Sequence, residues 1–344
     1  MRILLLIVIG SLLWSCAATQ STGDHRIDGI ALEGPPHPAE DAVMQEIAQQ
    51  GAEWVCLMPY AYMKDTRSEL IYGPVDWTWW GEKSDGIRAL IHRARAADLS
   101  IMLKPHLWIG RGYYTGELSF SDTAQQEKWN ADYRQYLLHY AHMAEEEEVE
   151  LLCIGTELCM QLNDDPAFWT SLIEDIREVY TGKLTYAANW DCYQDFPLWK
   201  QLDYIGIDAY FPITEVEEPK MEDALAGWTY WKESMRKYVD TVGRPILFTE
   251  YGYRSKKGAL AEPWVSGTGA DGEPDKDIQS LGYEALYCTF WNEAWFQGGF
   301  LWKWHVEEMH RPAERSKDYT PQEKPAMDII RKHYGAQSLK KKEQ

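Results

Sequence analysis

The stretch Glu150-Leu-Leu-Cys-Ile-Gly-Thr-Glu157 decides the fold of this chain. It is a short apolar run that ends on an acidic residue, and its length and content are typical of a buried parallel strand. A helix-like stretch, Phe168–Tyr180, follows it, with the capping residue Asp165 and then Pro166 at its start. The next apolar run is Leu184–Asn189. The segment is therefore predicted to form a strand, a helix and a second strand.

The same unit recurs along the whole chain. Eight apolar runs alternate with helix-like stretches, and no break in composition divides them. The runs are Ile27–Leu32, Glu53–Pro59, Ile101–His106, Glu150–Thr156, Leu184–Asn189, Tyr204–Ala209, Pro245–Tyr251 and Gly299–Trp304. We predict an α/β protein that consists of a single (β/α)8 TIM barrel. An open doubly wound sheet is the alternative, but no glycine-rich turn follows the first run.

The first residues are predicted to be an export signal. Arg2 is followed by an apolar run, Ile3–Leu13, which is too short to span a bilayer and has the length of a signal-peptide core. Cys16, directly after a small residue, resembles the bacterial lipoprotein processing site, where the cysteine is lipidated. We expect an exported bacterial lipoprotein, periplasmic or at the cell surface, that meets the membrane only through this lipid anchor. Ordinary secretory cleavage beyond Cys16 is the alternative.

These considerations divide the chain into four parts. We expect a signal peptide at 1–16, a short tether at 17–24, the barrel domain at 25–334 and a disordered basic tail at 335–344. The five cysteines of the body are interpreted as small buried hydrophobes with no disulfide framework. They are Cys56, Cys153, Cys159, Cys192 and Cys288.

Composition narrows the classes of ligand. The formal net charge is −20, and phosphate binding needs clustered Lys and Arg, so nucleic acid is not an expected partner. The chain has 17 Trp and 21 Tyr but only 8 Phe. Trp and Tyr join an apolar face to a polar edge, which suits a site that stacks flat, hydroxyl-bearing ligands.

No sequence pattern supports metal or nucleotide chemistry. The chain has no HExxH, no GxSxG elbow and no P-loop, and its first strand lacks His-x-His. The string Gly267-Thr-Gly-Ala-Asp-Gly272 matches GxGxxG but neither follows a predicted strand nor opens into a helix. We therefore expect no cofactor and no metal.

Two glutamates at strand ends carry the predicted chemistry. Glu157 ends the fourth strand and Glu250 ends the seventh, at the edge of a barrel where active sites are built. Glycoside hydrolysis needs such a pair, one acid to protonate the leaving oxygen and one carboxylate to attack the anomeric carbon. A single glutamate at a strand end is equally compatible with a structural ion pair. The pair beside an aromatic-rich loop, Tyr60–Ser84, is more specific.

Five segments on five of the strands carry a family resemblance. They are Leu103-Lys-Pro-His106, Ile154-Gly-Thr-Glu157, Tyr204-Ile-Gly-Ile-Asp-Ala-Tyr210, Phe248-Thr-Glu-Tyr-Gly-Tyr253 and Gly299-Phe-Leu-Trp-Lys-Trp304. With these segments the chain resembles glycosidase clan A, the retaining (β/α)8 barrels, and within it glycoside hydrolase family 113, the β-mannanase family. The resemblance implies a retaining, double-displacement endo-hydrolase of β-1,4-mannan or manno-oligosaccharides, with Glu157 as acid/base and Glu250 as nucleophile.

One position departs from the clan. The residue before the acid/base is usually an Asn that holds the sugar 2-hydroxyl, whereas this chain has Thr156. The 2-hydroxyl of a mannosyl unit is axial, so a different partner is reasonable. Asn189, at the end of the fifth strand, is our candidate.

Further substrate-binding residues are expected around the two glutamates. Glu157 should sit in an apolar or like-charged setting that raises its pKa, and Tyr210 should donate a hydrogen bond to Glu250. Of Trp302 and Trp304 we expect one ring to point inward beneath the reacting sugar, and we favour Trp304. The remaining candidates are Lys104 and His106 on one face of the third strand, the weaker candidates Trp190 and Asp208, and Trp108 and Trp264 at outer subsites. A buried Lys is rarely unpaired, so we expect a sugar hydroxyl or a nearby carboxylate as the partner of Lys104.

Two other functions remain open at the level of sequence. One is a different clan A β-glycanase, acting on glucan, xylan or galactan. It stays open because the sequence does not identify the residues that select the configuration of the sugar hydroxyls. The other is a non-catalytic glycan-binding lipoprotein that keeps the aromatic platforms without the chemistry. The presence of both carboxylates argues against the second.

Overall fold

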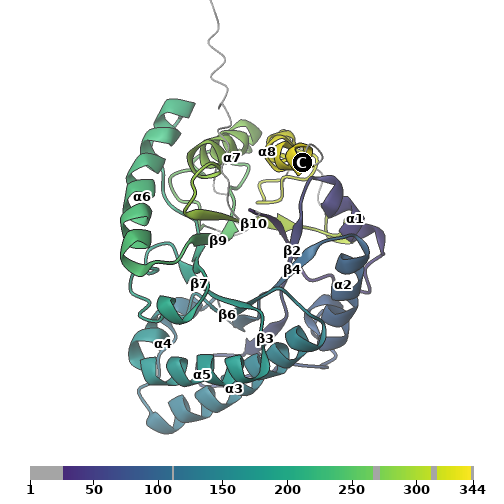
Figure 1. The fold of residues 1–344 in the computed structure, drawn as a ribbon, viewed down its shortest axis with the longest axis vertical. Coiled ribbons are helices and arrows are strands. Elements are labelled where there is room, and N and C mark those ends of the chain that lie inside the picture. The colour runs from purple at the N-terminus through teal and green to yellow at the C-terminus, as the bar shows by residue number, and fades with distance from the viewer. Residues whose placement is uncertain (1–25, 111, 266–271, 311–315, 342–344) are drawn as a thin grey trace, which may run out of the picture.

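Eight parallel strands close into a barrel (Figure 1). The computed structural model describes residues 26–110, 112–265, 272–310 and 316–341. Around the barrel the strands follow the order β1-β10-β9-β8-β7-β6-β4-β2, so each predicted strand has its place and the (β/α)8 prediction is confirmed. The barrel strands are β1 Ile27–Leu32, β2 Trp54–Leu57, β4 Ser100–Leu103, β6 Leu151–Thr156, β7 Lys183–Asn189, β8 Ile205–Asp208, β9 Ile246–Tyr251 and β10 Phe296–Trp304.

Helices surround the ring of strands in Figure 1. They are α1 Ala42–Gln49, α2 Ser84–Ala96, α3 Thr123–Glu146, α4 Cys159–Asp164, α5 Pro166–Val179, α6 Met221–Val242, α7 Lys276–Phe290 and α8 Ala326–Lys341. Asp165 caps α5 as predicted, and Asp122 caps α3; each accepts a hydrogen bond from the first turn of its helix. Helix α8 continues past residue 334, where we had placed the end of the barrel domain.

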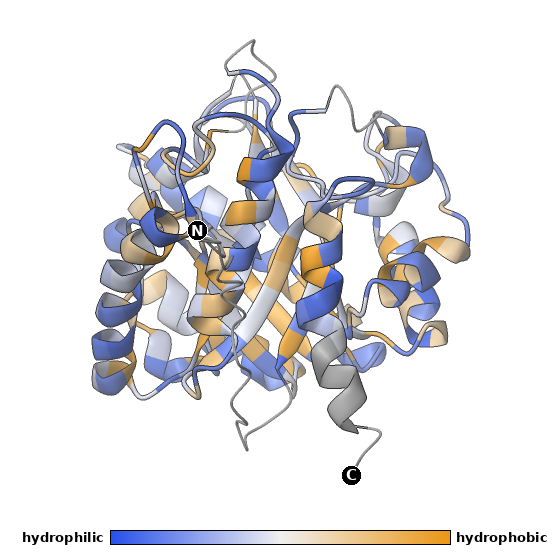
Figure 2. Cartoon of the chain, turned by 90° about the horizontal axis from the view of Figure 1, so that it is seen from above, coloured by the Kyte–Doolittle hydropathy of each residue, from blue (hydrophilic) through white to orange (hydrophobic). Residues whose placement is uncertain are grey.

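The strands separate two apolar cores. One fills the barrel interior and includes Ala31, Cys56, Cys153 and Phe300. The larger one lies between the strands and the surrounding helices, and it takes the alternate residues of the same strands, such as Leu32. Figure 2 shows this layering as mostly orange strands behind helices that mix orange and blue residues.

A second, two-stranded sheet extends the barrel at its carboxyl edge. Strand β3, Tyr60–Met63, follows β2 after Pro59, and β5, His106–Ile109, follows β4 after Pro105. The two pair in parallel, and the backbone N–H of His106 donates to the carbonyl of Pro59. This small sheet was not predicted. It raises the first aromatic loop above the mouth of the barrel.

The cysteines behave in two ways. Cys56 and Cys153 are buried free thiols of the barrel interior, as predicted. Cys159 and Cys192 form a disulfide, so the expectation of no disulfide framework is wrong. The pairing joins residues 33 positions apart, and nothing in the local sequence indicates that the fold brings them together.

The expected signal peptide, tether and lipidated Cys16 lie outside the described residues. Among the helices that are described, none is long and apolar enough to span a bilayer.

Candidate active site

Glu157 and Glu250 lie at the carboxyl edge of the barrel. Glu157 directly follows β6, and Glu250 is the last residue but one of β9. Strand β8 lies between β7 and β9, and its final residue, Asp208, pairs in register with Glu250. Parallel strands end at the same edge, so three carboxyl groups gather there.

Glu250 is buried and is held by two donors. The Lys104 ammonium donates to its Oε1 at 2.5 Å, and the Tyr210 hydroxyl donates to its Oε2 at 2.7 Å. Tyr210 follows β8 closely, so the hydrogen bond that we expected joins neighbouring strand ends. Each carboxylate oxygen therefore has its own donor, and one donor is a cation.

Lys104 is wholly buried and bridges two carboxylates. Besides Glu250, its Nζ contacts both oxygens of Asp208, at 3.2 and 3.3 Å. An ammonium has three donors, and all three face these carboxylate oxygens. Of the two partners expected for the buried Lys104, a sugar hydroxyl or a nearby carboxylate, the structure shows carboxylates. Lys104 lies two positions before His106, and its contact helps to fix the position of the Glu250 carboxylate.

Asp208 is a second buried carboxyl group that shares the Lys104 ammonium with Glu250. It also accepts a hydrogen bond from the Thr249 hydroxyl at 2.8 Å. Burial, and next the charge of Glu250, raise the pKa of Asp208 although it contacts Lys104. One ammonium is shared between two carboxylates, so the positive charge of Lys104 does not offset burial and the charge of Glu250.

Glu157 lies in the setting predicted for a general acid. Burial, followed by the charges of Asp208 and Glu250, raises the pKa of Glu157 well above its ordinary value. Lys104 opposes this shift but contacts the other two carboxylates. The raised pKa of Glu157 favours its protonated form, which is the form that a general acid needs. The hydroxyl of the preceding Thr156 is buried without a hydrogen-bond partner.

His106 and Trp302 cover the same region from β5 and β10. Their rings stack at a centroid distance of 6.1 Å, and the Lys104 ammonium lies 6.0 Å from the Trp302 ring centre. The His106 Nε2 has no hydrogen-bond partner and lies 3.8 Å from Oε1 of Glu250. Burial, and next Lys104, lower the pKa of His106 well below its usual range, so the ring is neutral.

The preference for Trp304 as the inward ring is wrong. Trp302 packs against the barrel-interior core, whereas Trp304 is 5% exposed and belongs to the core between strands and helices. Residues two apart in a regular strand face the same side. Here the register of β10 against β1 shifts between Ala31, which pairs with Trp302, and Leu32, which pairs with Trp304. The irregularity turns Trp304 outward.

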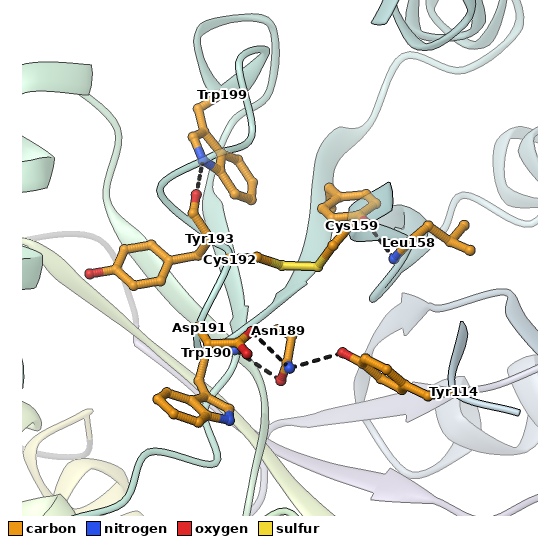
Figure 3. The surroundings of a disulfide bond; sticks show 10 residues. Tyr114, Leu158, Cys159, Asn189, Trp190, Asp191, Cys192, Tyr193 and Trp199 are labelled. Atoms are coloured by element: carbon orange, nitrogen blue, oxygen red, sulfur yellow. Dashed lines mark hydrogen bonds between the residues drawn. A yellow bond between two sulfur atoms is a disulfide. The ribbon is translucent and has the colours of Figure 1, made fainter. Parts of the chain in front are cut away.

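Asn189 lies at the end of β7 within a hydrogen-bonded turn (Figure 3). Its amide donates to the Tyr114 hydroxyl at 2.9 Å and to Asp191 at 3.0 Å, and its Oδ1 accepts from the backbone of Trp190. Both amide donors are therefore engaged within the protein, and direct binding of a sugar hydroxyl would require an exchange of partners. Tyr114 and Asp191 were missed by the sequence, because neither lies on a predicted strand.

A second charged group at the mouth was also missed. Glu33, which follows β1, contacts Lys303 at 2.6 Å and His305 at 2.7 Å. Burial would raise the pKa of Glu33, but the hydrogen bonds of His305 and Lys303 hold it at about 2. The sequence signal that could have found this group is the pair of basic residues beside Trp304 at the end of the last strand.

Aromatic rings continue from the two glutamates across the rim. On the β3–β5 sheet, Tyr60 pairs with His106 and Tyr62 with Trp108, whose side chain is 55% exposed. Trp77 packs edge-on against Tyr62 and is 59% exposed. This surface, Tyr60, Tyr62, Trp77 and Trp108, is called the β3–β5 rim below.

A second aromatic group stands beyond Asn189. Trp190 stacks on Trp264 with ring centres 5.1 Å apart, and Trp264 remains partly exposed.

As for metals, no group of three or more His, Cys, Asp or Glu side chains among the described residues is arranged to hold one.

Comparisons with known proteins agree with this geometry. The sequence model of Glycoside Hydrolase Family 113 matches residues 36–324. A solved GH113 β-mannanase from Alicyclobacillus acidocaldarius, in complex with ManMIm, is 27% identical with a TM-score of 0.80, covering 91% of this chain and 98% of that one.

Two more distant structures share the fold. A solved GH113 β-1,4-mannanase is 22% identical with a TM-score of 0.78, covering 91% of this chain and 99% of its own. A glycoside hydrolase family 5 mannosidase from Rhizomucor miehei is 13% identical with a TM-score of 0.66, covering 93% and 94%. No curated protein sequence matches the chain.

Proposed function

The chain belongs to glycoside hydrolase family 113 and is a glycoside hydrolase; on that premise we propose that it is a retaining endo-β-1,4-mannanase. Its substrate is β-1,4-mannan or the corresponding oligosaccharides. Glu157 is the acid/base and Glu250 is the nucleophile.

The observation that carries this assignment is the asymmetry between the two glutamates. Glu250 has a cationic donor and a hydroxyl donor on its two oxygens, which is the arrangement that an ionised carboxylate requires. Glu157 has a pKa raised by burial and by the neighbouring carboxylates, which is what a general acid requires. Environments that separate two carboxyl groups in this way assign one as acid and the other as base or nucleophile.

The reaction then follows in two displacements. Glu157 donates its proton to the glycosidic oxygen while an oxygen of Glu250 attacks the anomeric carbon, and the bond to the leaving sugar breaks. The product is a glycosyl ester of Glu250. The ionised Glu157 next takes a proton from a water molecule, which attacks the same carbon and releases Glu250 with net retention of configuration.

The surrounding residues have supporting roles. Trp302, stacked on His106 above the Lys104 ammonium, offers a flat face beneath the reacting sugar. Lys104 and Tyr210 fix the nucleophile, and the buried Asp208 fixes Lys104.

Two features support mannan as the substrate and cleavage within the polysaccharide chain. The solved structures that the chain is similar to include β-mannanases by name. The β3–β5 rim and the Trp190–Trp264 pair offer exposed rings away from the two glutamates, which suits a chain longer than one sugar.

Product analysis on matched hexasaccharides tests this function. The protein without its first 24 residues is incubated with β-1,4-linked manno-, gluco- and xylohexaose, with Glu250→Ala as the inactive control. We expect mannohexaose to be cut to short oligomers by the wild type alone. Preferred cleavage of another hexaose would overturn the mannan assignment and favour a different β-glycanase. Binding without turnover would favour a glycan-binding protein.

We also propose that the protein is exported and held to a membrane by lipid on Cys16. The support is the short apolar run, Ile3–Leu13, before that cysteine. Metabolic labelling with an alkyne fatty acid in a bacterial host should label the full chain but not Cys16→Ala. An unlabelled wild type in the soluble exported fraction would contradict the anchor.

A further inference from the structure

A disulfide joins the two strand ends beside the acid/base residue (Figure 3). Cys159, the first residue of α4, lies two positions after Glu157, and Cys192 lies three positions after Asn189. Their Cα atoms are 6.5 Å apart, which is within the range that a disulfide spans. The bond therefore fastens the chain leaving β6 to the chain leaving β7.

The backbone around Glu157 adopts a conformation that needs support. Glu157 has φ 53°, in the left-handed region that residues other than glycine rarely adopt. Its N–H donates to the carbonyl of Ala187 at 2.8 Å, and the next N–H, of Leu158, donates to the Tyr186 hydroxyl at 2.7 Å. Both partners belong to β7, so β7 determines where the Glu157 side chain starts.

Tyr186 can reach this backbone because Gly155 has no side chain. A Cβ on Gly155 would lie 2.7 Å from the Tyr186 ring, closer than two such atoms approach. The contact between β6 and β7 is therefore built into both strands. The disulfide is the covalent part of the same contact.

The other end of the disulfide belongs to the Asn189 turn. The N–H of Cys192 donates to the carbonyl of Asn189 at 3.1 Å, which closes the turn. Within it Asn189 holds Asp191 and Tyr114. Burial is the main cause of the raised pKa values of Glu157 and Tyr114. The charge of Asp191 adds to the first shift and the charge of Glu157 to the second.

We propose that the Cys159–Cys192 disulfide is a positioning element for the acid/base. It holds the segment that carries Glu157 against the Asn189 turn, so that the carboxyl group stays sheltered from water and directed at the leaving oxygen. This inference rests on the proposed function of Glu157. It assigns the disulfide to one half of the reaction, which is proton delivery to the leaving group. The nucleophile is held separately by Lys104 and Tyr210, and Lys104 is in turn held by Asp208, so its position does not depend on the disulfide.

The test compares two substrates that differ in their need for a proton. A manno-oligosaccharide leaves only when its oxygen is protonated, whereas the 2,4-dinitrophenolate of an aryl β-mannobioside leaves without help. The value of kcat/KM reports the first displacement for both. In Cys159→Ser/Cys192→Ser we expect kcat/KM to fall roughly 10–100-fold on mannotetraose, as misplacement of a catalytic group by about 1 Å does, and to change little on the aryl substrate.

The pH profile gives a second readout. Besides burial, the titratable groups that act on Glu157 are Asp208, Glu250, Lys104, Asp191 and the three tyrosines Tyr114, Tyr186 and Tyr319. They remain in the variant, but water gains access to Glu157, which lowers its pKa towards the ordinary value. The alkaline limb of kcat/KM on mannotetraose should therefore move to lower pH. A disulfide that only stabilises the fold would leave this limb in place.

If the double variant folds poorly, reduction of the disulfide in the wild-type protein tests the same proposal. Dithiothreitol should produce the same selective loss on mannotetraose, reversed on reoxidation, and should not add to the loss in the double variant. An equal fall on both substrates, or no fall on either, would overturn the proposal.

Glu157→Ala separates this outcome from a failure of the proposed function. If Glu157 is the acid, that variant loses mannotetraose cleavage and keeps the first displacement on the aryl substrate. If it loses both equally, the assignment of Glu157 is wrong, whatever the disulfide variant does.

Discussion

The Lys104 ammonium lies 2.5 Å from Oε1 of Glu250 and within 3.3 Å of both oxygens of Asp208, with no solvent exposure. One buried cation thus serves two carboxylates, while the third, Glu157, is left with a raised pKa. A charge cluster of this kind is costly for stability and useful for catalysis, because it separates the protonation states of the two glutamates.

Lys104→Met should destabilise the protein strongly. It leaves Asp208 and Glu250 buried without their cation, and breaking a buried ion pair in this way costs about 3–5 kcal/mol. Chemical denaturation at pH 7 measures the loss. Adding Asp208→Asn should recover part of it, because one of the uncompensated charges is removed. A double variant as unstable as the sum of the two single variants would contradict the shared-cation account.

Glu157→Gln should stabilise the protein at neutral pH while abolishing cleavage of mannan. The folded pKa of Glu157 is raised above its unfolded value of about 4.3, so its contribution to stability is complete below that value and is lost as pH rises through the folded pKa. Glutamine does not titrate. The melting temperature of the variant should match the wild type near pH 4 and exceed it increasingly towards pH 8. A constant difference across this range would contradict the raised pKa.

Trp302 and Trp304 should respond in opposite ways to the same substitution. Trp302→Phe removes part of the flat face beside His106 and Lys104, so kcat/KM on mannohexaose should fall by about tenfold or more with little change in stability. Trp304→Phe opens a cavity between strands and helices, which should cost about 1–3 kcal/mol with activity retained. Steady-state kinetics and chemical denaturation of the two variants test this prediction. Lost activity in Trp304→Phe with lost stability in Trp302→Phe would show that Trp304 is the inward ring.

Trp108→Ala should affect long substrates selectively. Its exposed ring lies on the β3–β5 rim, away from the two glutamates, so only a chain that extends beyond the reacting sugar can reach it. We expect kcat/KM to fall about tenfold on mannohexaose and to stay unchanged on mannotriose. Tyr230→Ala, which removes an exposed ring of α6, is the matched control and should change neither value. Equal effects on both substrates would exclude an outer subsite at Trp108.

The sequence predicted the barrel well because its signal repeats. Each of the eight apolar runs became a strand, and the two glutamates were found because an acidic residue at the end of such a run is costly unless it has a role. The β3–β5 sheet was missed because the predicted strand Glu53–Pro59 stopped at its proline, while the predicted strand Ile101–His106 ran through Pro105. A proline there ends one strand and starts the next.

The errors at the site have tertiary causes. Trp302 and Trp304 face different sides because the register of β10 against β1 shifts between them, and such a shift cannot be read from the sequence of one strand. For Lys104 the sequence left two partners open, a sugar hydroxyl and a carboxylate, because its type and place indicate a polar partner but not which one. The Cys159–Cys192 bond depends on the proximity of two strand ends, which spacing alone does not reveal.

The central claim is that Glu250 attacks the sugar and Glu157 protonates the leaving group. Trapping the glycosyl-enzyme with an activated 2-deoxy-2-fluoro-β-mannoside, followed by peptide mapping by mass spectrometry, tests it most directly. The account predicts one stoichiometric label on the peptide that contains Glu250, absent in Glu250→Gln and still formed in Glu157→Gln, because an activated leaving group needs no acid. A label on any other residue, or none while mannohexaose is hydrolysed with inversion of configuration, would contradict it.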